Sequence, residues 1–264
     1  MDTLLLTTKF RQIGANLQVR TANQIRFGDR PRGYSIDILN TRKGETFDLV
    51  VAEDDLDVRV VDSDPADRHL LLLVNSRTAP VRRKFLCGHD ERHWFIAGVE
   101  AAVSSVRQAK EALKPQTVQI DQDRKRVKSK NRNRRRNAAF VRQGEWFFVP
   151  APDLKPDEWL VLRDEPIRRG RGKPHVVEFL FRRGGIPVRI CRNYPNGLTE
   201  SEYAALIRRD PDKAKLAWRN MIREPEAFAK GRVRHPDHKT VVLRNWHRIL
   251  PNNEVRNTNM AFLD

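Results

Sequence analysis

The chain has 264 residues, of which 39% are hydrophobic, so a core of ordinary size can form and a wholly disordered chain is excluded. Its net charge is +17, from 51 Lys and Arg against 34 Asp and Glu, and residues 1–114 are nearly balanced, with 18 basic and 16 acidic residues. The positive excess therefore lies after residue 114 and favours a nucleic acid partner, while the lack of any run of 18 apolar residues argues against a membrane.

The first residues and the two cysteines indicate where the protein works. Asp2 stands where a secretory signal peptide carries positive charge, and the apolar run from Leu4 to Leu6 is too short for its hydrophobic region. Cys87 and Cys191 are far apart in the sequence, so we expect reduced thiols rather than a disulfide framework. The protein is therefore expected in the cytoplasm, or in the nucleoid if the host is bacterial.

Short strands are expected through the first half of the chain. Their sequences alternate apolar and polar residues or are continuously apolar, and residues that favour turns separate most of them. The spacing of about 10 to 13 residues predicts an antiparallel sheet that curls toward a barrel or a sandwich. A helix is expected at 104–114, because helix-forming residues there end before Pro115. The predicted strands are 34–39, 45–51, 57–62, 69–75, 82–87 and 93–99.

Cys87, His89 and His93 form a first set of metal-ligand residue types. If the chain turns through 90–92, His89 faces His93 and Cys87 points to the same side of the hairpin. Zinc prefers such ligands, so a zinc site is one interpretation, and a polar hairpin tip over an ordinary core is the other. The acidic residues 53–55 could likewise hold magnesium, although a solvated acidic turn explains them as well.

The most unusual stretch of the sequence runs from Arg124 to Arg136. Nine of its thirteen residues are Lys or Arg, and only Val127 is apolar. Such a run repels itself and buries little, so we expect an extended linker that also serves as an arm for binding a polyanion. The cations of this basic stretch are Arg124, Lys125, Arg126, Lys128, Lys130, Arg132, Arg134, Arg135 and Arg136.

Strand patterns continue after the basic stretch and are interrupted by helical ones. Thr199 and Glu202 form a capping box, which predicts a helix that begins there. A further helix is expected at 211–222, and the Gly184-Gly185 pair predicts a hairpin turn. The strands predicted in this part are 138–150, 158–163, 174–183, 186–191, 231–235 and 239–243.

The chain is therefore expected to be an α+β protein. It would contain two mainly antiparallel β domains with a few helices, joined by a basic linker. The N-terminal β-rich domain, with its closing helix, is placed at 1–120. The linker follows at 121–137, and the basic C-terminal α+β domain at 138–264.

Two features of the C-terminal part suggest nucleic-acid contacts. Trp146 and the two phenylalanines after it fall on both faces of a strand, so one ring could be exposed for base stacking, although a core strand is the alternative. The segment 166–175 combines cations with two glycines that let the backbone approach a phosphate, and a flexible charged loop is the alternative. The cations of this segment are Arg168, Arg169, Arg171 and Lys173.

Histidines gather near the end of the sequence. The Pro236-Asp237 pair suits the centre of a tight turn, which would set His235 opposite His238, and His247 follows after a short strand. These imidazoles could act as general acid and base in phosphodiester cleavage, could bind a metal, or could be turn residues that touch phosphate. His175 lies alone on an expected strand and is interpreted as structural.

Together these features favour a nucleic-acid-binding protein. RNA or single-stranded DNA is preferred to duplex, because helix-turn-helix and zinc-finger spacings are missing from the sequence. One alternative is a nuclease or other phosphodiesterase that uses the paired histidines, with zinc or magnesium if a metal takes part. The other is a structural subunit of a nucleoprotein complex, which would have protein partners as well.

Overall fold

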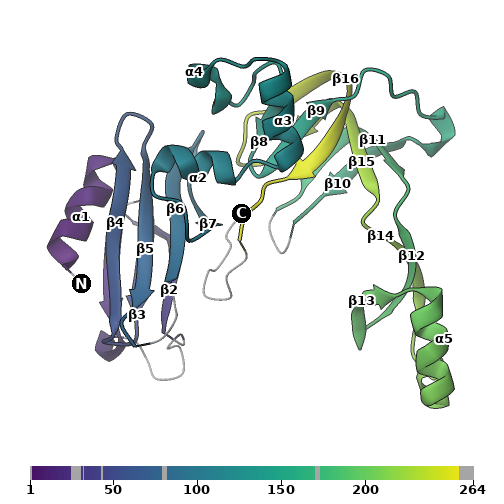
Figure 1. The fold of residues 1–264 in the computed structure, drawn as a ribbon, viewed down its shortest axis with the longest axis horizontal. Helices are drawn as coiled ribbons and strands as arrows, with labels where there is room; N and C mark the ends of the chain where they lie inside the picture. Colours follow the sequence, from purple (N-terminus) through teal and green to yellow (C-terminus); the bar gives the residue numbers. More distant parts are fainter. Residues whose placement is uncertain are drawn as a thin grey trace.

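The computed structural model describes residues 2–24, 31, 33–42, 44–78, 82–169 and 173–255. The strands of this described part form four sheets, and every strand pair is antiparallel except β1 with β3, which agrees with the expected α+β class. Figure 1 shows two sheets of the N-terminal half at one end of the molecule, a larger sheet beyond them, and a small lobe that projects from the larger sheet.

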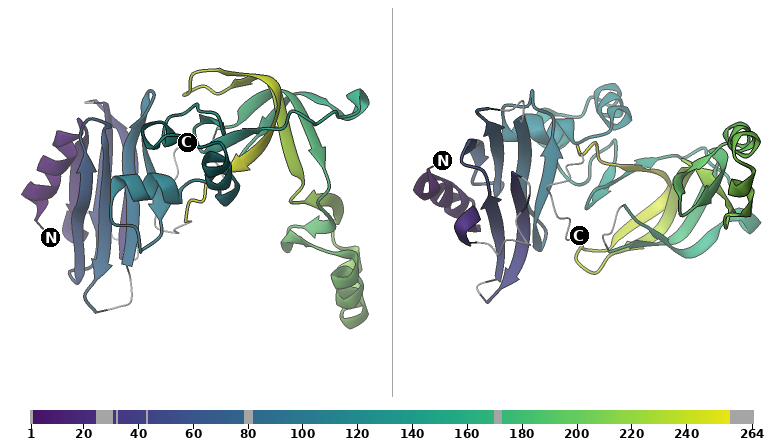
Figure 2. Two further views of the ribbon diagram at one scale, coloured as in Figure 1. Left: turned by 45° about the horizontal axis from the view of Figure 1, so that its top comes forward. Right: turned by 90° about the horizontal axis from the view of Figure 1, so that it is seen from below.

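Two sheets pack face to face in the N-terminal half (Figure 2). Leu70, Leu72 and Phe85 from one sheet meet Ile36 and Phe47 from the other in a fully buried core. All six strands predicted in this half are present, in a sandwich rather than a barrel. The first sheet contains β1 (Asn16–Thr21), β3 (Gly44–Val51) and β2 (Tyr34–Thr41), and the second contains β4 (Leu56–Asp64), β5 (His69–Ser76), β6 (Arg82–Asp90) and β7 (His93–Val99).

One helix packs where the edge strands β1 and β4 of the two sheets meet, and another covers an outer face of the sandwich. α1 (Thr3–Gln12) contributes Phe10 to the core between the sheets, and α2 (Val106–Ala112), expected at 104–114, packs Ala109 on the outer face of β5 and β6. α1 was not among the predicted elements, because only two of its ten residues are buried and its apolar stripe is short.

None of the helices in the described part of the chain has the length and the apolar sequence needed to cross a membrane.

The basic stretch 124–136 is folded, so the expectation of an extended linker is wrong. Val127 packs beside Phe140 in a small apolar cluster, and the side-chain amide of Gln122 donates to the carbonyl of Arg132 at 2.7 Å. These contacts offset the repulsion among the cations. The division of the chain into domains at this stretch stays a prediction. The helix α3 (Gln116–Arg124) leads into the stretch, and the short helix α4 (Ser129–Arg132) lies within it.

A six-stranded antiparallel sheet forms most of the C-terminal half. One of its faces buries Phe148, Leu180 and Val233, and the other face of β9 packs Phe147 against Phe140. The strand order is β10-β11-β15-β16-β9-β8. The bounds are β8 (Val141–Gln143), β9 (Trp146–Pro150), β10 (Leu162–Ile167), β11 (His175–Arg183), β15 (Glu226–Arg234) and β16 (Val241–Pro251).

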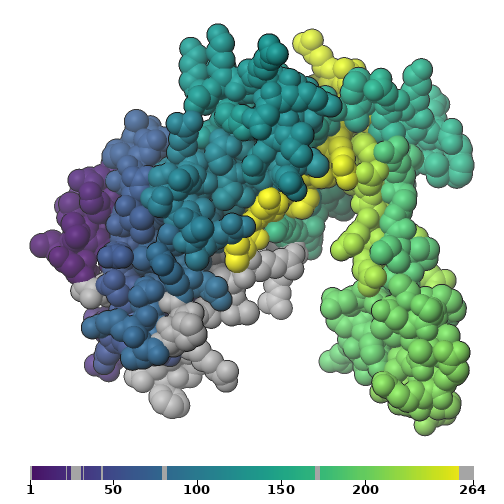
Figure 3. Space-filling view, in the orientation of Figure 1, coloured from purple at the N-terminus to yellow at the C-terminus, as the bar shows by residue number. Residues whose placement is uncertain are grey.

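A small lobe projects from this sheet and stands clear of the body (Figure 3). The predicted capping box of Thr199 and Glu202 is confirmed at the start of its helix. The lobe contains β12 (Ile186–Cys191), β13 (Tyr194–Leu198), α5 (Glu200–Arg209), the 3-10 turn Pro211–Lys215 and β14 (Arg219–Arg223).

Two predictions about the lobe are wrong. The helix expected at 211–222 gives way to β14, because antiparallel pairing with β12 overrides the local helical pattern. Trp218, placed in that helix, instead stacks on Tyr194 with ring centroids 5.5 Å apart. The hairpin expected at Gly184-Gly185 is absent, because β11 and β12 belong to different sheets and the glycines, both at positive φ, carry the chain from one to the other.

The residues after β16 return to the N-terminal sandwich. The Val255 amide donates to the Gly98 carbonyl at 2.9 Å, and the Asn253 amide donates to the Leu113 carbonyl at 2.9 Å. Only glycine fits at position 98, because a Cβ there would lie 2.2 Å from the carbonyl oxygen of Val255. This segment therefore covers the outer edge of β7 and ties the two halves together.

Candidate nucleic-acid interface and histidine cluster

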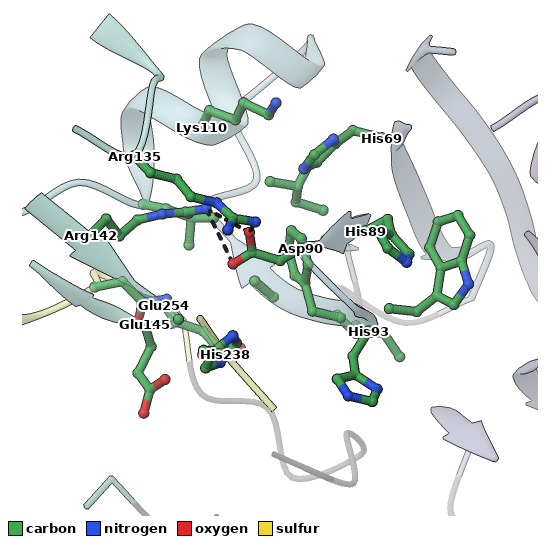
Figure 4. Close-up of a pocket in the computed structure, with 18 of the residues that line it drawn as sticks. His69, His89, Asp90, His93, Lys110, Arg135, Arg142, Glu145, His238 and Glu254 are labelled. Atoms are coloured by element: carbon green, nitrogen blue, oxygen red, sulfur yellow. Dashed lines mark hydrogen bonds and ion pairs between the residues drawn. The ribbon is translucent and has the colours of Figure 1, made fainter. Parts of the chain in front are cut away.

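A cavity of about 690 Å³ lies where the β6–β7 hairpin, the basic stretch and the six-stranded sheet meet (Figure 4). Its lining combines apolar side chains with many charged ones, and it contains five of the seven histidines of the chain. The histidines are His69, His89, His93, His235 and His238, and the lining cations are Lys110, Lys114, Lys130, Arg134, Arg135, Arg142 and Lys173.

The tip of the β6–β7 hairpin supplies two carboxylates that hold the basic stretch in place. Asp90 accepts hydrogen bonds from Arg135 and, at 3.3 Å, from Arg142 (Figure 4). Arg135 also pairs with Glu91. Burial raises the pKa of Asp90, but Arg142 and Arg135 more than offset this and hold that pKa below its usual value. Asp90 is therefore ionised and serves as the counter-charge for two arginines.

The hairpin does not bring Cys87, His89 and His93 together as a ligand set. The strand register pairs His93 with Asp90, so the turn contains two residues rather than the expected three. Cys87 is fully buried in the core of the sandwich, and burial raises the pKa of its thiol. The Nδ1 atom of His93 instead lies 2.6 Å from the carboxylate of Glu45.

Three histidines meet at the wall of the cavity. The rings of His235 and His238 stack with centroids 4.6 Å apart, so their expected pairing across the turn is confirmed. His175 stacks on His235 with centroids 4.2 Å apart. One ring nitrogen from each of the three lies within 4.8 Å of the other two, the one such group of His, Cys, Asp or Glu in the described part of the chain. We call His175, His235 and His238 the histidine cluster.

Strand pairing brings His175 into the cluster. β11 and β15 are antiparallel neighbours in a register that places His175, the first residue of β11, beside His235 at the end of β15. The side-chain amide of Gln143 then donates to main-chain carbonyls on both sides of the loop that carries His235 and His238, at 3.2 and 2.8 Å. The sequence gives no local signal for His175, because this register depends on residues about sixty positions apart.

Burial favours the neutral form of these imidazoles. It lowers the pKa of His175 to about 3 and that of His238 to about 4, and the neighbouring ring of His235 adds to both effects. Both are therefore neutral at pH 7. A general acid at this pH needs a protonated imidazole, whereas a metal ion binds the neutral form. The cluster thus suits metal binding better than acid–base catalysis by a histidine pair.

The basic stretch presents most of its charge to solvent. Arg132 and Arg135 are partly buried and pair with acidic side chains, Arg124 pairs with Asp121 but is 71% exposed, and Lys125 and Arg136 donate to main-chain carbonyls. Four exposed cations have side chains with no ion pair or hydrogen bond to any described residue. These free cations are Arg126, Lys128, Lys130 and Arg134.

The other residues expected to contact nucleic acid are mostly engaged elsewhere. Trp146 is 9% exposed and lies in the core of the six-stranded sheet with the phenylalanines beside it, so the expectation of an exposed ring in this strand is wrong. Arg169 donates to a main-chain carbonyl after β16 at 2.9 Å, and Lys173 forms a 2.8 Å ion pair with an aspartate. Arg168 is exposed, and Arg171 lies outside the described residues.

The remaining candidates lie away from the histidine cluster. His247 is buried in β16, its Nδ1 atom is 2.7 Å from a main-chain carbonyl, and burial lowers its pKa. Within the acidic segment 53–55, Asp55 is occupied by hydrogen bonds from the hydroxyl groups of Ser76 and Thr78.

One exposed aromatic ring was not predicted from the sequence. Trp159 is 81% exposed in the 3-10 turn Glu158–Leu160, where a strand was expected.

No family model matches this chain, and neither does any curated protein or solved structure. Its function is therefore inferred from the cavity, the free cations and the histidine cluster.

Proposed function

We propose that this protein binds single-stranded nucleic acid, RNA or DNA, along the basic stretch and at the mouth of the cavity. The observation that carries the proposal is the set of four free cations, of which Lys130 and Arg134 also line the cavity. A folded surface that holds neighbouring like charges without counter-charges carries a repulsion that a polyanion relieves.

The fold of the basic stretch supports this proposal. Contacts of the neighbouring Gln122 and Val127 restrain the main chain around the cations, so less conformational freedom is lost on binding than with an extended arm. Trp94 and Phe95 line the cavity and are only half buried, which gives an unstacked base aromatic surfaces to contact. Bases in a duplex are not free to enter such a cavity, and for this reason we favour a single strand.

Replacing Arg126, Lys128, Lys130 and Arg134 together with Gln tests the proposal. Each phosphate contact releases counterions, so the logarithm of the affinity falls with the logarithm of salt concentration, with a slope of about −0.7 per contact on single strands. We expect the variant to flatten this slope by about 2 to 3 units. Fluorescence anisotropy of labelled RNA, single-stranded DNA and duplex over a range of salt concentrations measures it.

A charge-matched control separates a local site from the effect of net charge. Arg11, Arg59, Arg82 and Arg83 are exposed on the N-terminal half and have no ion pair with any described residue. Their joint replacement with Gln removes the same charge and should leave the salt slope as in the wild type. An equal loss in both variants would contradict a site on the basic stretch, and a wild-type protein that binds none of the three probes would rule out the function.

A second function, cleavage of the bound strand, is favoured by the position of the histidine cluster in the cavity wall. Because His175 and His238 are neutral at pH 7, cleavage would depend on a metal-bound water rather than on a histidine acid. Cleavage of labelled RNA or DNA that stops with EDTA and returns with added metal would support this function. No cleavage with zinc, manganese or magnesium would remove it and leave binding as the function.

A further inference from the structure

We infer that His175, His235 and His238 bind a divalent transition metal ion of the zinc class. The ring nitrogens of the three residues already lie within 4.8 Å of one another. Small movements of the rings would place all three nitrogens at about 2.0–2.1 Å from one bound ion, which is the distance between zinc and an imidazole nitrogen. This site stands independently of whether the protein binds nucleic acid.

Unsatisfied polar atoms are the first support for the site. Neither ring nitrogen of His175, which is 1% exposed, has a hydrogen-bond partner in the described part of the chain. Buried polar atoms in folded proteins are almost always paired, because leaving them unpaired costs free energy of folding. An ion that accepts a lone pair from the His175 ring removes part of this cost.

The space beside the rings is the second support. Gly144 has a φ of +56°, and a Cβ built there would lie 2.9 Å from the Nε2 atom of His238 and 3.3 Å from that of His175. The glycine therefore keeps open the space next to both nitrogens. The same two nitrogens are thus the natural ligand atoms of these rings.

Neighbouring groups also orient the rings. The Glu91 carboxylate lies 3.9 Å from the Nδ1 atom of His238, and carboxylates near the outer nitrogen of a ligating histidine commonly fix its tautomer. The Nδ1 atom of His235 accepts a hydrogen bond of 3.1 Å from the Asp237 amide. A metal at the Nε2 atom of His235 moves the ring proton to Nδ1, so binding there costs this one hydrogen bond.

The ligand types select the metal. Three imidazoles suit zinc, cobalt, nickel, copper or iron, whereas magnesium prefers oxygen ligands, so the magnesium alternative does not apply here. Zinc sites with three protein ligands keep one position open for water or substrate. His235, His238 and Gly144 line the cavity, so the open position of the ion faces the space where a substrate oxygen could bind.

Cobalt and zinc titrations test the site. Protein treated with a chelator and freed of it is titrated with Co²⁺, which absorbs visible light when bound to nitrogen ligands, and the Co²⁺ is then displaced by Zn²⁺. We expect one ion per chain, confirmed by elemental analysis. Replacing His175, His235 or His238 with Gln should each lower the affinity by at least about 10–100-fold, and Glu91→Gln should lower it by about 10-fold because Glu91 acts through His238.

Matched histidine variants locate the ion. His247→Gln changes a buried histidine outside the cluster, and His89→Gln and His93→Gln change the hairpin, so all three should bind metal as the wild type does. Loss of the buried His175 can unfold the sheet, whereas the ring of His238 reaches the cavity. His238→Gln is therefore the decisive variant, and circular dichroism checks its folding. The inference is overturned if wild-type protein binds neither ion, if His238→Gln binds with unchanged affinity, or if the hairpin variants lose the metal.

Discussion

Replacing Asp90 with Asn is expected to lower the free energy of unfolding by roughly 2–3 kcal/mol at neutral pH. Asp90 is 14% exposed and is the shared counter-charge of Arg135 and Arg142, so its loss leaves Arg142 without a carboxylate and leaves Arg135 with Glu91 alone. Fully buried pairs lose more, about 3–5 kcal/mol, but these arginines are about one third exposed and water screens part of the repulsion. The midpoint of urea unfolding measures the change.

Two further variants serve as controls for this measurement. Asp153→Asn changes an exposed aspartate that has no partner among the described residues, and it should alter stability by less than about 0.5 kcal/mol. Arg142→Gln in the Asp90→Asn background removes the guanidinium group that has lost its carboxylate and should restore part of the loss. A stability of Asp90→Asn equal to that of Asp153→Asn would show that the hairpin tip does not hold the basic stretch.

Acidification from about pH 8 to about pH 5 is expected to destabilise the protein by about 2 kcal/mol through His69 alone. The ring is 7% exposed, donates to the carbonyl of Asp67 and packs edge-on against Phe95. Burial, with a smaller effect of Arg142, lowers its pKa from 6.5 to about 4. As the pH falls below 6.5 the unfolded chain therefore takes up the proton before the folded one, and stability that is present above pH 6.5 is lost down to about pH 4.

The variant His69→Asn isolates this contribution. Its amide nitrogen can keep the hydrogen bond to Asp67 but does not titrate, while every other histidine titrates as in the wild type. Chemical unfolding of both proteins at the two pH values should show the smaller acid loss in the variant. Equal losses would show that the imidazole of His69 reaches solvent in the folded protein.

The strands of the N-terminal half could be predicted because their pattern is local. β7 was expected at 93–99 and is found at His93–Val99, since alternation and turn residues alone define it. β14 could not be predicted in the same way. Its residues resemble a helix when considered alone, and only pairing with β12, more than twenty-five residues earlier, makes them a strand.

The candidate sites also differ in whether they depend on local sequence or on long-range strand pairing. The contact of His235 with His238 follows from four neighbouring residues and was predicted, whereas His175 joins them only through the β11–β15 register. For Cys87 the alternation was correctly interpreted, but the face it shares with Phe85 packs against the neighbouring sheet instead of solvent. Sequence periodicity predicts which residues share one face of a strand, but it does not predict what packs against that face.

The segment that pairs Val255 with Gly98 has a consequence for the integrity of the chain. A protease cut in the basic stretch, for example after Lys128, would leave two fragments that still share the hydrogen bonds of Val255 and Asn253 to the N-terminal half. The Asp90 ion pairs with Arg135 and Arg142 would bridge them as well. The fragments should therefore elute together in gel filtration, and fragments expressed separately should reassemble on mixing, so the protein would tolerate a nick in the basic stretch.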